Sequence, residues 1–320
     1  MIHIKEQRAV SNTALTIPPY GLGAAHIPVN GESVAIETVQ TALDNGIWFI
    51  DTAPLYGAGK SESYIGKAVA GVHRDHFVLA TKVGRLIPPD YDGGPLPFDY
   101  SYDGVMRSLD ESLARLQLDY VDILHIHDAD DHYRDALDSA FPTLEKLRSQ
   151  GVIKAIGAGM NQWEMLGDFA RNADFDCFLL AGRYTLLEQT SLEFLQLCHE
   201  KNISVILGGV YNSGILAGTT TPGNLYNYSQ APQDMLDKAV KIAALCQQYD
   251  VPLNAAALQF PFANAGVTSM VVGAETPQQV IANLMTLNHP IPRALWPALQ
   301  EAQLVATGTP MPGSGTISPS

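Results

Sequence analysis

Eight short apolar segments recur along the chain, with helical periodicity between them. The segments are YGLGA (20–24), WFIDTA (48–53), FVLATKV (77–83), VDILHIH (121–127), KAIGAGM (154–160), CFLLAGR (177–183), SVILGGV (204–210) and SMVVGA (269–274). Several are nearly continuous in apolar residues, as expected for parallel strands that are covered by helices on the outside. Eight strand–helix repeats within 320 residues predict a (β/α)8 TIM barrel rather than a doubly wound sheet.

The segments between these strands carry helix signals. Apolar residues at Val105, Leu109, Leu113 and Leu116 recur on one face of 103–117, and 133–150, 188–201 and 233–249 have the same character. Residues 276–279 (TPQQ) predict a helix start, with Thr276 as N-cap, proline at the first position and Gln279 completing a capping box. No linker interrupts the pattern, so we expect a single domain over 1–320 with a flexible tail from about residue 307.

Composition excludes several classes of protein. A formal charge of −14 argues against a nucleic-acid surface, which needs clustered Lys and Arg. The chain has neither an apolar run of about 18 residues nor an apolar N-terminal stretch, so we expect no membrane span and no secretory signal. Three cysteines without metal-like spacing indicate reduced thiols and a cytoplasmic enzyme.

The stretch GAGKS (57–61) suggests a phosphate loop at first sight. A phosphate loop needs a further glycine five residues before the one that precedes the lysine, and this position is Pro54. The glycine-rich backbone that would hold a phosphate is therefore incomplete, and an ATPase is not expected.

Polar residues interrupt the apolar strands where an active site of a barrel would lie, at the carboxyl ends. Asp51 ends the second strand, Tyr56 follows it, and Lys82 and His127 lie near the ends of the next two strands. A neighbouring ammonium lowers the pKa of a phenol, a carboxylate keeps the lysine charged, and a histidine orients a substrate oxygen. The set predicts acid/base chemistry at a carbonyl or alcohol carbon, although an ion pair that merely caps the barrel would also explain Asp51 and Lys82.

Two other uses of these residues remain open from the sequence alone. His125 lies on the same strand face as His127, one layer deeper, and HIHDADDH (125–132) has the composition of a metal site. No further ligands are well placed on later strands, so we expect no metal. Lys82 as a Schiff-base nucleophile would need a depressed pKa, which Asp51 would oppose.

The chain contains no G-x-G-x-x-G, so a Rossmann dinucleotide site is not expected. Gly208 and Gly209 end the seventh strand and are followed by YNSG (211–214), and the capped helix at 276 follows the eighth. Barrels commonly bind phosphate at these two loops. Simple packing at the barrel rim would also account for the glycines.

At these residues the sequence resembles the aldo-keto reductase family over about residues 15–290. The match is most specific in GIWFIDTAPLYGAGKSE (46–62) and YVDILHIHD (120–128). The resemblance implies that Asp51, Tyr56, Lys82 and His127 are catalytic, because the family pattern places an Asp, a Tyr five residues later, and then Lys and His on the next two strands. KVGRL, AGRYTLLEQ and GGVYNSGIL are similar to the branch that contains aldose 1-dehydrogenases, which act on L-fucose and D-threo-aldoses, and pyridoxal 4-dehydrogenase.

The resemblance also implies a nicotinamide cofactor, with departures from the common pattern. Where many members hold the nicotinamide with Ser-Asn, Gln and a stacking Tyr, this chain has Gly159-Met160 before Asn161, then Ala181 and Gly208. The Lys and Arg that grip the 2′-phosphate of NADP correspond to Gly273 and Gln279, and Glu275 beside them would repel a phosphate, which favours NAD. The residues expected to bind the cofactor are Gly23, Gly159, Asn161, Gly208, Tyr211, Asn212, Ser213, Gly214, Gly273, Ala274, Glu275, Gln279 and Asn283.

The sequence therefore predicts NAD-dependent oxidation of an aldose of the L-fucose, L-galactose or D-arabinose type at C1. The partners expected are a small sugar or sugar-like substrate, without nucleic acid or membrane, in a monomer or homodimer. Pyridoxal 4-dehydrogenation and NADPH-dependent carbonyl reduction are alternatives. A cofactor-binding, redox-sensing partner subunit with little turnover is an alternative of another class.

Overall fold

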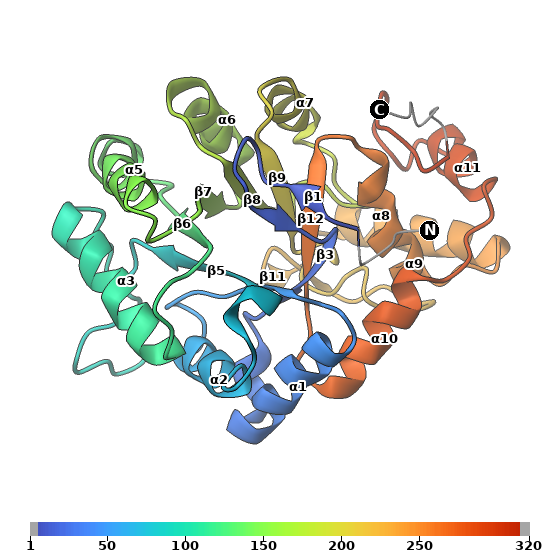
Figure 1. The fold of residues 1–320 in the computed structure, drawn as a ribbon. Coiled ribbons are helices and arrows are strands. Elements are labelled where there is room, and N and C mark those ends of the chain that lie inside the picture. The colour runs from blue at the N-terminus through green and yellow to red at the C-terminus, as the bar shows by residue number, and fades with distance from the viewer. Residues whose placement is uncertain (1–5, 314–320) are drawn as a thin grey trace.

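The computed structural model describes residues 6–313 and contains a closed barrel of eight parallel strands (Figure 1). The strands are β3 (Tyr20–Gly23), β4 (Phe49–Asp51), β5 (Val78–Val83), β6 (Ile123–His127), β7 (Ala155–Met160), β8 (Cys177–Ala181), β9 (Ser204–Gly208) and β12 (Val267–Gly273). β12 pairs with both β9 and β3, which closes the ring. Each of the eight apolar segments forms one of these strands, so the predicted (β/α)8 TIM barrel is confirmed.

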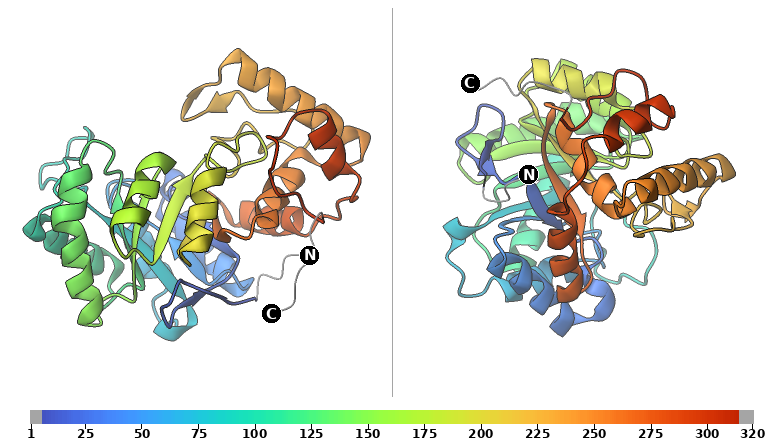
Figure 2. Two further views of the ribbon diagram at one scale, coloured as in Figure 1. Left: turned by 90° about the horizontal axis from the view of Figure 1, so that it is seen from above. Right: turned by 90° about the vertical axis from the view of Figure 1, so that its right-hand side faces the viewer.

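Helices surround the barrel, as the views from the side and above show (Figure 2). They are α1 (Glu32–Asp44), α2 (Lys60–Ala68), α3 (Tyr102–Leu116), α4 (Tyr133–Asp135), α5 (Phe141–Ser149), α6 (Trp163–Asn172), α7 (Leu192–Glu200), α8 (Gln233–Gln248), α9 (Leu253–Gln259), α10 (Pro277–Leu287) and α11 (Leu295–Glu301). The helix expected over 133–150 is divided by a π-helical turn, Ala136–Ala140. Pro142 has no N–H to donate to the carbonyl one turn earlier, which explains the interruption.

The N-terminal end of the barrel is closed by an apolar hairpin, β1 (Arg8–Ala9) and β2 (Thr16–Ile17), which lies across the middle of the ring in Figure 1. Val10, Leu15 and Ile17 pack against Phe49 and Ile123 inside the barrel. Side chains alternate between the inside and the outside of each strand. Apolar side chains fill the barrel at this end. The inward positions at the opposite end, where the strands have their carboxyl ends, are therefore the ones that polar groups can occupy.

The start of α10 follows the sequence prediction in part. Thr276 Oγ1 accepts a hydrogen bond from Gln279 N at 3.2 Å, which confirms the N-cap. Gln279 Oε1 accepts from the backbone N–H of Glu275, at 2.7 Å, rather than from that of Thr276. The prediction of a capping box is therefore wrong in its second hydrogen bond, which comes from the residue before the N-cap. The side chain of Gln279 instead binds the end of the segment that precedes the helix.

The C-terminal segment is described only to residue 313. Thr309 and Met311, within the tail expected from about 307, are buried, and the rest of the expected tail, 314–320, lies outside the described residues. Within residues 6–313, no helix has the length and apolar character needed to cross a lipid bilayer.

Close contact between α2 and α3 gives a prediction for stability. A Cβ on Gly66 in α2 would lie 2.3 Å from the backbone oxygen of Leu116, whereas one on Gly167 in α6 would meet the flexible end of Arg171 at 3.2 Å. We expect Gly66→Ala to lower the free energy of unfolding by about 1–3 kcal/mol. Gly167→Ala, which gains helix propensity, is expected to be neutral or to add up to about 1 kcal/mol. Urea unfolding measures both, and equal effects of the two substitutions would contradict the packing described.

Candidate active site

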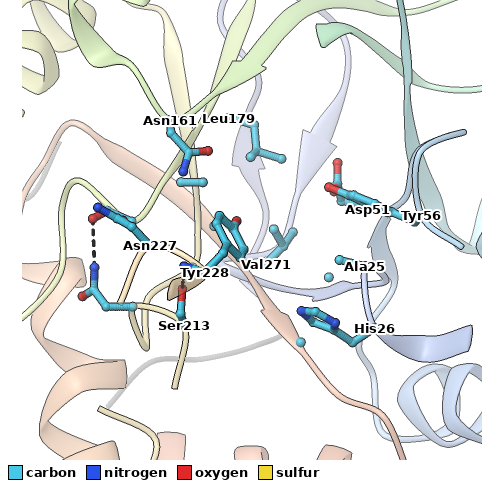
Figure 3. A pocket seen from close by; sticks show the side chains of 17 residues that line it. Ala25, His26, Asp51, Tyr56, Asn161, Leu179, Ser213, Asn227, Tyr228 and Val271 are labelled. Carbon is cyan, nitrogen blue, oxygen red and sulfur yellow. Dashed lines mark hydrogen bonds between the residues drawn. The ribbon is translucent and has the colours of Figure 1, made fainter. Parts of the chain in front are cut away.

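The polar residues predicted at the strand ends do meet at the carboxyl end of the barrel. Asp51, Lys82 and His127 occupy inward positions on β4, β5 and β6 and are almost fully buried. Tyr56, in the loop after β4, lies beside Asp51 at one side of a pocket (Figure 3). Tyr56 also lines an adjoining pocket, together with Lys82 and His127. The four side chains therefore lie around two adjoining pockets, at the end of the barrel opposite the apolar hairpin.

Asp51 and Lys82 form a buried ion pair. Lys82 Nζ donates to Asp51 Oδ1 at 2.9 Å, to Asp51 Oδ2 at 2.7 Å and to the carbonyl oxygen of Thr52 at 2.8 Å. These three bonds hold the ammonium against Asp51 and the backbone of the strand end. Burial acts to lower the pKa of Lys82, but the charge of Asp51 outweighs it and the pKa is raised. The amine is therefore held charged, which disfavours a Schiff-base nucleophile.

Tyr56 adjoins this ion pair. Lys82 Nζ lies 4.7 Å from the centroid of its ring, and the ring meets that of His127 edge to face at 6.1 Å. Burial raises the pKa of Tyr56 to about 12, while the charge of Lys82 acts in the opposite direction. The ammonium thus acts in the expected direction, but the net pKa in the protein alone is raised, because the loss of solvent around the phenol exceeds the effect of the ammonium.

The two histidines of β6 differ in depth, as their alternation on the strand predicts. His125 lies one layer below His127, and burial lowers its pKa to about 3. Burial and the nearby charges of Lys82 and Arg85 lower the pKa of His127 well below its usual range. His127 is therefore a neutral imidazole at the pocket, suited to a hydrogen bond with a substrate oxygen.

The histidines of HIHDADDH do not gather into one cluster of side chains. Residues 6–313 contain no group of three or more His, Cys, Asp or Glu side chains placed to hold a metal ion. In HIHDADDH, His125 points into the barrel, whereas His132 lies beyond the strand end, where it adjoins the ring of Phe98 and pairs with Asp135 at 3.2 Å. The motif is therefore divided between two environments.

The GAGKS stretch forms the turn that leads from Tyr56 into α2. Gly59 has φ of +81°, and a Cβ there would also lie 2.6 Å from Arg115. Ser61 Oγ donates to the carbonyl oxygen of Ala24 at 2.9 Å and contacts Thr52 Oγ1 at 2.8 Å. These contacts tie the turn to the ends of β3 and β4, so the stretch positions Tyr56 and Asp51.

A groove of three adjoining pockets runs from Tyr56 to the start of α10, and His26 and Tyr228 line all three. It collects most of the expected cofactor residues: Gly159 and Asn161 near Tyr56 and Lys82, Gly23, Gly208 and Asn212 in the middle, and Tyr211, Ser213, Gly214, Gly273, Ala274, Glu275 and Gln279 at the far end. Asn283 is not part of this lining, and its side chain donates to the carbonyl oxygen of Gly273 at 3.1 Å. The side chain of Asn212 is buried and donates to Gly182 O at 3.0 Å.

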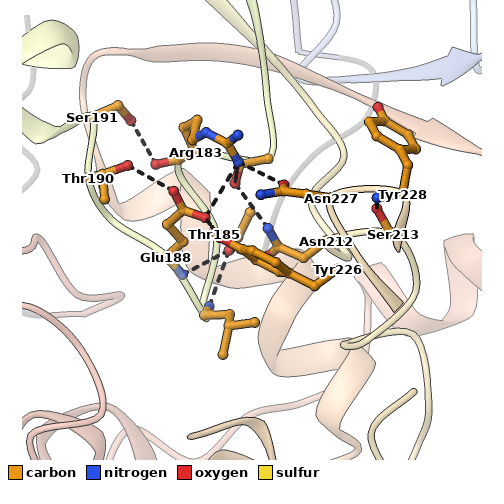
Figure 4. Close-up of polar contacts among 12 residues, drawn as sticks. Arg183, Thr185, Glu188, Thr190, Ser191, Asn212, Ser213, Tyr226, Asn227 and Tyr228 are labelled. Carbon is orange, nitrogen blue, oxygen red and sulfur yellow. Dashed lines mark hydrogen bonds and ion pairs between the residues drawn. The ribbon is translucent and has the colours of Figure 1, made fainter. Parts of the chain in front are cut away.

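Sequence reasoning missed a hairpin that overhangs this groove, β10 (Leu225–Tyr226) and β11 (Ser229–Gln230). Its tip residues, Asn227 and Tyr228, both have positive φ, of 47° and 62°. Tyr228 is 74% exposed and projects over the pocket, and its backbone N–H donates to Ser213 Oγ at 2.9 Å (Figures 3 and 4).

The base of the hairpin is anchored to the loop after β8. Arg183 donates to Asn227 Oδ1 at 2.9 Å and lies 3.6 Å from Glu188, which also accepts from the Tyr226 hydroxyl (Figure 4). The only sequence signal for this element is an asparagine-containing turn, NYS, and this does not reveal which pocket the turn covers.

Comparisons with known proteins agree with the geometry. The model of the aldo/keto reductase family matches residues 20–303. The chain belongs to this family. It is 40% identical to a D-threo-aldose 1-dehydrogenase from Pseudomonas sp, covering 93% of this chain and 98% of that protein. It is 36% identical to a pyridoxal 4-dehydrogenase from Microbacterium luteolum, and the match covers 95% of this chain and 100% of that protein. The solved structure of an aldo-keto reductase from Bacillus halodurans, in its holo form, superposes on this chain with a TM-score of 0.78 at 26% identity. The superposition covers 94% of this chain and 95% of the other.

Family membership makes the protein an oxidoreductase, and its dehydrogenase relatives act on CH–OH groups. The family uses nicotinamide cofactors on small-molecule substrates.

The buried ion pair predicts a difference between single and double substitutions. We expect Asp51→Asn to abolish most turnover and to lower the free energy of unfolding by about 3–5 kcal/mol, because it leaves the Lys82 ammonium buried without its counter-charge. Asp51→Asn combined with Lys82→Met removes both charges and is expected to recover most of that stability without activity. Glu32→Gln, which breaks the exposed pair with Lys67, is the control and should cost less than about 1 kcal/mol. Denaturant unfolding measures the stability of each variant, and activity assays measure its turnover. If Asp51→Asn were as stable as the wild type, the buried lysine would not need its counter-charge.

Proposed function

We propose that this oxidoreductase oxidises an aldose of the L-fucose, L-galactose or D-arabinose type at C1 to the lactone, with NAD as hydride acceptor. The observation that carries the proposal is the Asp51–Lys82 pair beside the phenol of Tyr56, at one end of a groove long enough to connect the strand ends with α10. The relative at 40% identity is named for aldose 1-dehydrogenation and matches along nearly its whole length.

The groove has the form that a dinucleotide needs. A Cβ on Gly214 would have nothing within 4 Å, and one on Gly273 would project into space beside Gly23 O at 4.0 Å. Side chains at these positions would fill the groove, so the glycines keep it open to a ligand that approaches the backbone. The N-terminus of α10, capped by Thr276, lies at the far end, where a helix favours negative charge.

Each catalytic side chain has a distinct role in this proposal. Tyr56 takes the proton from the C1 hydroxyl, and His127 donates a hydrogen bond to the same oxygen as a neutral imidazole. Lys82 stabilises the phenolate electrostatically, and Asp51 keeps Lys82 charged and in place. When bound, oxidised nicotinamide supplies the hydride acceptor and a positive charge that further favours phenolate.

The proposed preference for NAD rests on the far end of the groove. Glu275 lines it together with Gln279, and Glu275 has no ion-pair partner among residues 6–313. A free carboxylate at this place opposes a 2′-phosphate, and the side chain of Gln279 is occupied by the backbone N–H of Glu275.

The remaining parts of the proposal concern the setting of the enzyme. We propose a cytoplasmic protein formed from one domain, as a monomer or homodimer. Its three cysteines, Cys177, Cys198 and Cys246, are free and buried, which suits a reducing compartment.

A substrate panel with each cofactor tests the function. Purified protein is supplied with NAD or NADP and with L-fucose, L-galactose, D-arabinose or pyridoxal, and the absorbance of reduced nicotinamide is followed. Formation of NADH with an aldose supports the proposal. Turnover of pyridoxal alone would make the protein a pyridoxal dehydrogenase. Preference for NADP with carbonyl substrates would point to a reductase, and cofactor binding without any turnover would point to a redox-sensing partner subunit.

The charge of Glu275 gives a prediction for cofactor choice. We expect Glu275→Gln to tighten NADP binding about fivefold, which corresponds to removal of about 1 kcal/mol of repulsion between exposed charges, with NAD binding unchanged. Glu145→Gln makes the same charge change at an exposed position of α5 and serves as control. Titration calorimetry measures both cofactors. Unchanged NADP affinity in Glu275→Gln would show that this carboxylate does not set the preference.

The raised pKa of Tyr56 gives a prediction for pH. Oxidation needs the phenolate, and below the pKa of a phenol its deprotonated fraction rises tenfold per pH unit. Because this pKa is about 12 in the protein alone, we expect kcat/KM for the sugar to rise with pH through the neutral range. Tyr56→Phe should lose about 10²–10⁴ of turnover and the rising limb, while still binding NAD. A pH-independent rate in the wild type would contradict the role of Tyr56 as base.

A further inference from the structure

A second pocket opens directly beside the catalytic one and has no part in the chemistry described so far. It is lined by Arg85, Phe98, Asp128, Asp130, Asp131 and Asn161, together with His132. Asp128 and Asn161 also line the pocket that holds Tyr56, Lys82 and His127. A molecule whose reacting carbon lies at Tyr56 can therefore extend into this second pocket.

The loop that forms one wall of this pocket is fixed at its base. Arg85 and Phe98 form an antiparallel bridge, flanked by hydrogen bonds from Leu86 N to Pro97 O at 3.0 Å and from Asp99 N to Gly84 O at 2.9 Å. The Tyr100 hydroxyl lies between the carbonyl oxygens of His127, at 2.6 Å, and Asp128, at 3.0 Å. The wall is thus attached to the end of β6, which carries His127.

Charge and aromatic surface face each other in this pocket. Arg85 Nη2 donates to Asp128 Oδ2 at 2.8 Å, and the Arg85 guanidinium lies 4.3 Å from the centre of the Phe98 ring. Asp128 has φ of +46°, a conformation that aspartate tolerates better than most residues, and its carboxylate lies between Arg85 and His127 Nε2, which is 3.6 Å away. Phe98 keeps 40% of its surface exposed.

These groups suit a neutral polyhydroxylated ligand. Carboxylates accept strong hydrogen bonds from hydroxyl groups, a guanidinium donates to hydroxyl oxygens, and an exposed phenyl ring offers apolar contact to C–H groups. Three carboxylates accompany one guanidinium, so an anionic ligand would be repelled. Phe98 is the one apolar side chain among the described residues that line the pocket, so a purely apolar extension of the ligand would gain little there.

We propose that this pocket is the sugar subsite of the enzyme, in which Asp128, paired with Arg85, binds the hydroxyl groups beyond C1 and Phe98 contacts the C–H face of the ring. The proposal rests on the proposed function, since it assumes that C1 of an aldose lies at Tyr56. It assigns the preference for an uncharged, polyhydroxylated aldose to Asp128 and Phe98.

Binding of an unreactive sugar ether tests the subsite apart from catalysis. The probe is 1,5-anhydro-L-fucitol, which keeps the ring and the other hydroxyls of L-fucose but lacks the C1 hydroxyl. Calorimetry in the presence of saturating NAD compares the wild type with Phe98→Ala and Asp128→Asn. We expect each variant to weaken binding at least tenfold. Tyr91→Ala and Asp90→Asn, exposed residues of the same loop that do not line the pocket, should stay within twofold of the wild type.

A catalytic comparison uses 2-hydroxytetrahydropyran, a cyclic hemiacetal without further hydroxyls. We expect Phe98→Ala to lower kcat/KM for L-fucose at least tenfold and to change that for the bare hemiacetal less than threefold. The proposed sugar subsite would be contradicted if the wild type does not bind the ether, or if neither variant weakens its binding. This holds even if L-fucose is oxidised. If L-fucose is not oxidised but the ether binds in a manner that depends on Phe98 and Asp128, the proposed reaction fails and the sugar subsite stands.

Discussion

The ion pair between Asp51 and Lys82 is the interaction on which the rest of the site depends. Removing two charges from water costs several kcal/mol per ion, and the pair recovers this only through close, fully bonded geometry. Here both carboxylate oxygens and the Thr52 carbonyl bind the ammonium within 2.9 Å. Such a pair contributes little net stability, so its value lies in placing a permanent positive charge beside the phenol of Tyr56.

The barrel brings the two charged side chains together and keeps water away from them. Alternation along β4, β5 and β6 points Asp51, Lys82 and His127 inward at one end, and the apolar layer with Val10, Leu15 and Ile17 excludes water from the other. The same burial raises the pKa of Tyr56 to about 12. Burial and the Lys82 charge therefore act on the phenol in opposite directions, and in the protein alone burial has the larger effect.

The sequence predicted the barrel, and it predicted that Asp51, Lys82 and His127 share its interior next to Tyr56, because each of these rests on a local pattern. Continuous apolar runs define parallel strands, and residue parity on a strand determines which side chains share its inner face. The relation of Tyr228 to the groove, the contact of Arg85 with Asp128 and the net pKa of Tyr56 escaped prediction. Each depends on distances between loops that are far apart in sequence, and on the balance of burial against charge, which no local pattern encodes. The π-helical turn before Pro142 shows the same limit at smaller scale, since periodicity alone predicted one continuous helix.

The most direct test of the central claim is an isotope experiment with L-fucose that carries deuterium at C1. If Tyr56 removes the hydroxyl proton while hydride leaves C1, deuterium must appear in the reduced nicotinamide, and the rate on the labelled sugar must be lower when hydride transfer limits turnover. Mass spectrometry of the NADH formed decides the matter. Full transfer of the label supports the account, whereas unlabelled NADH, or label released to water, would contradict it.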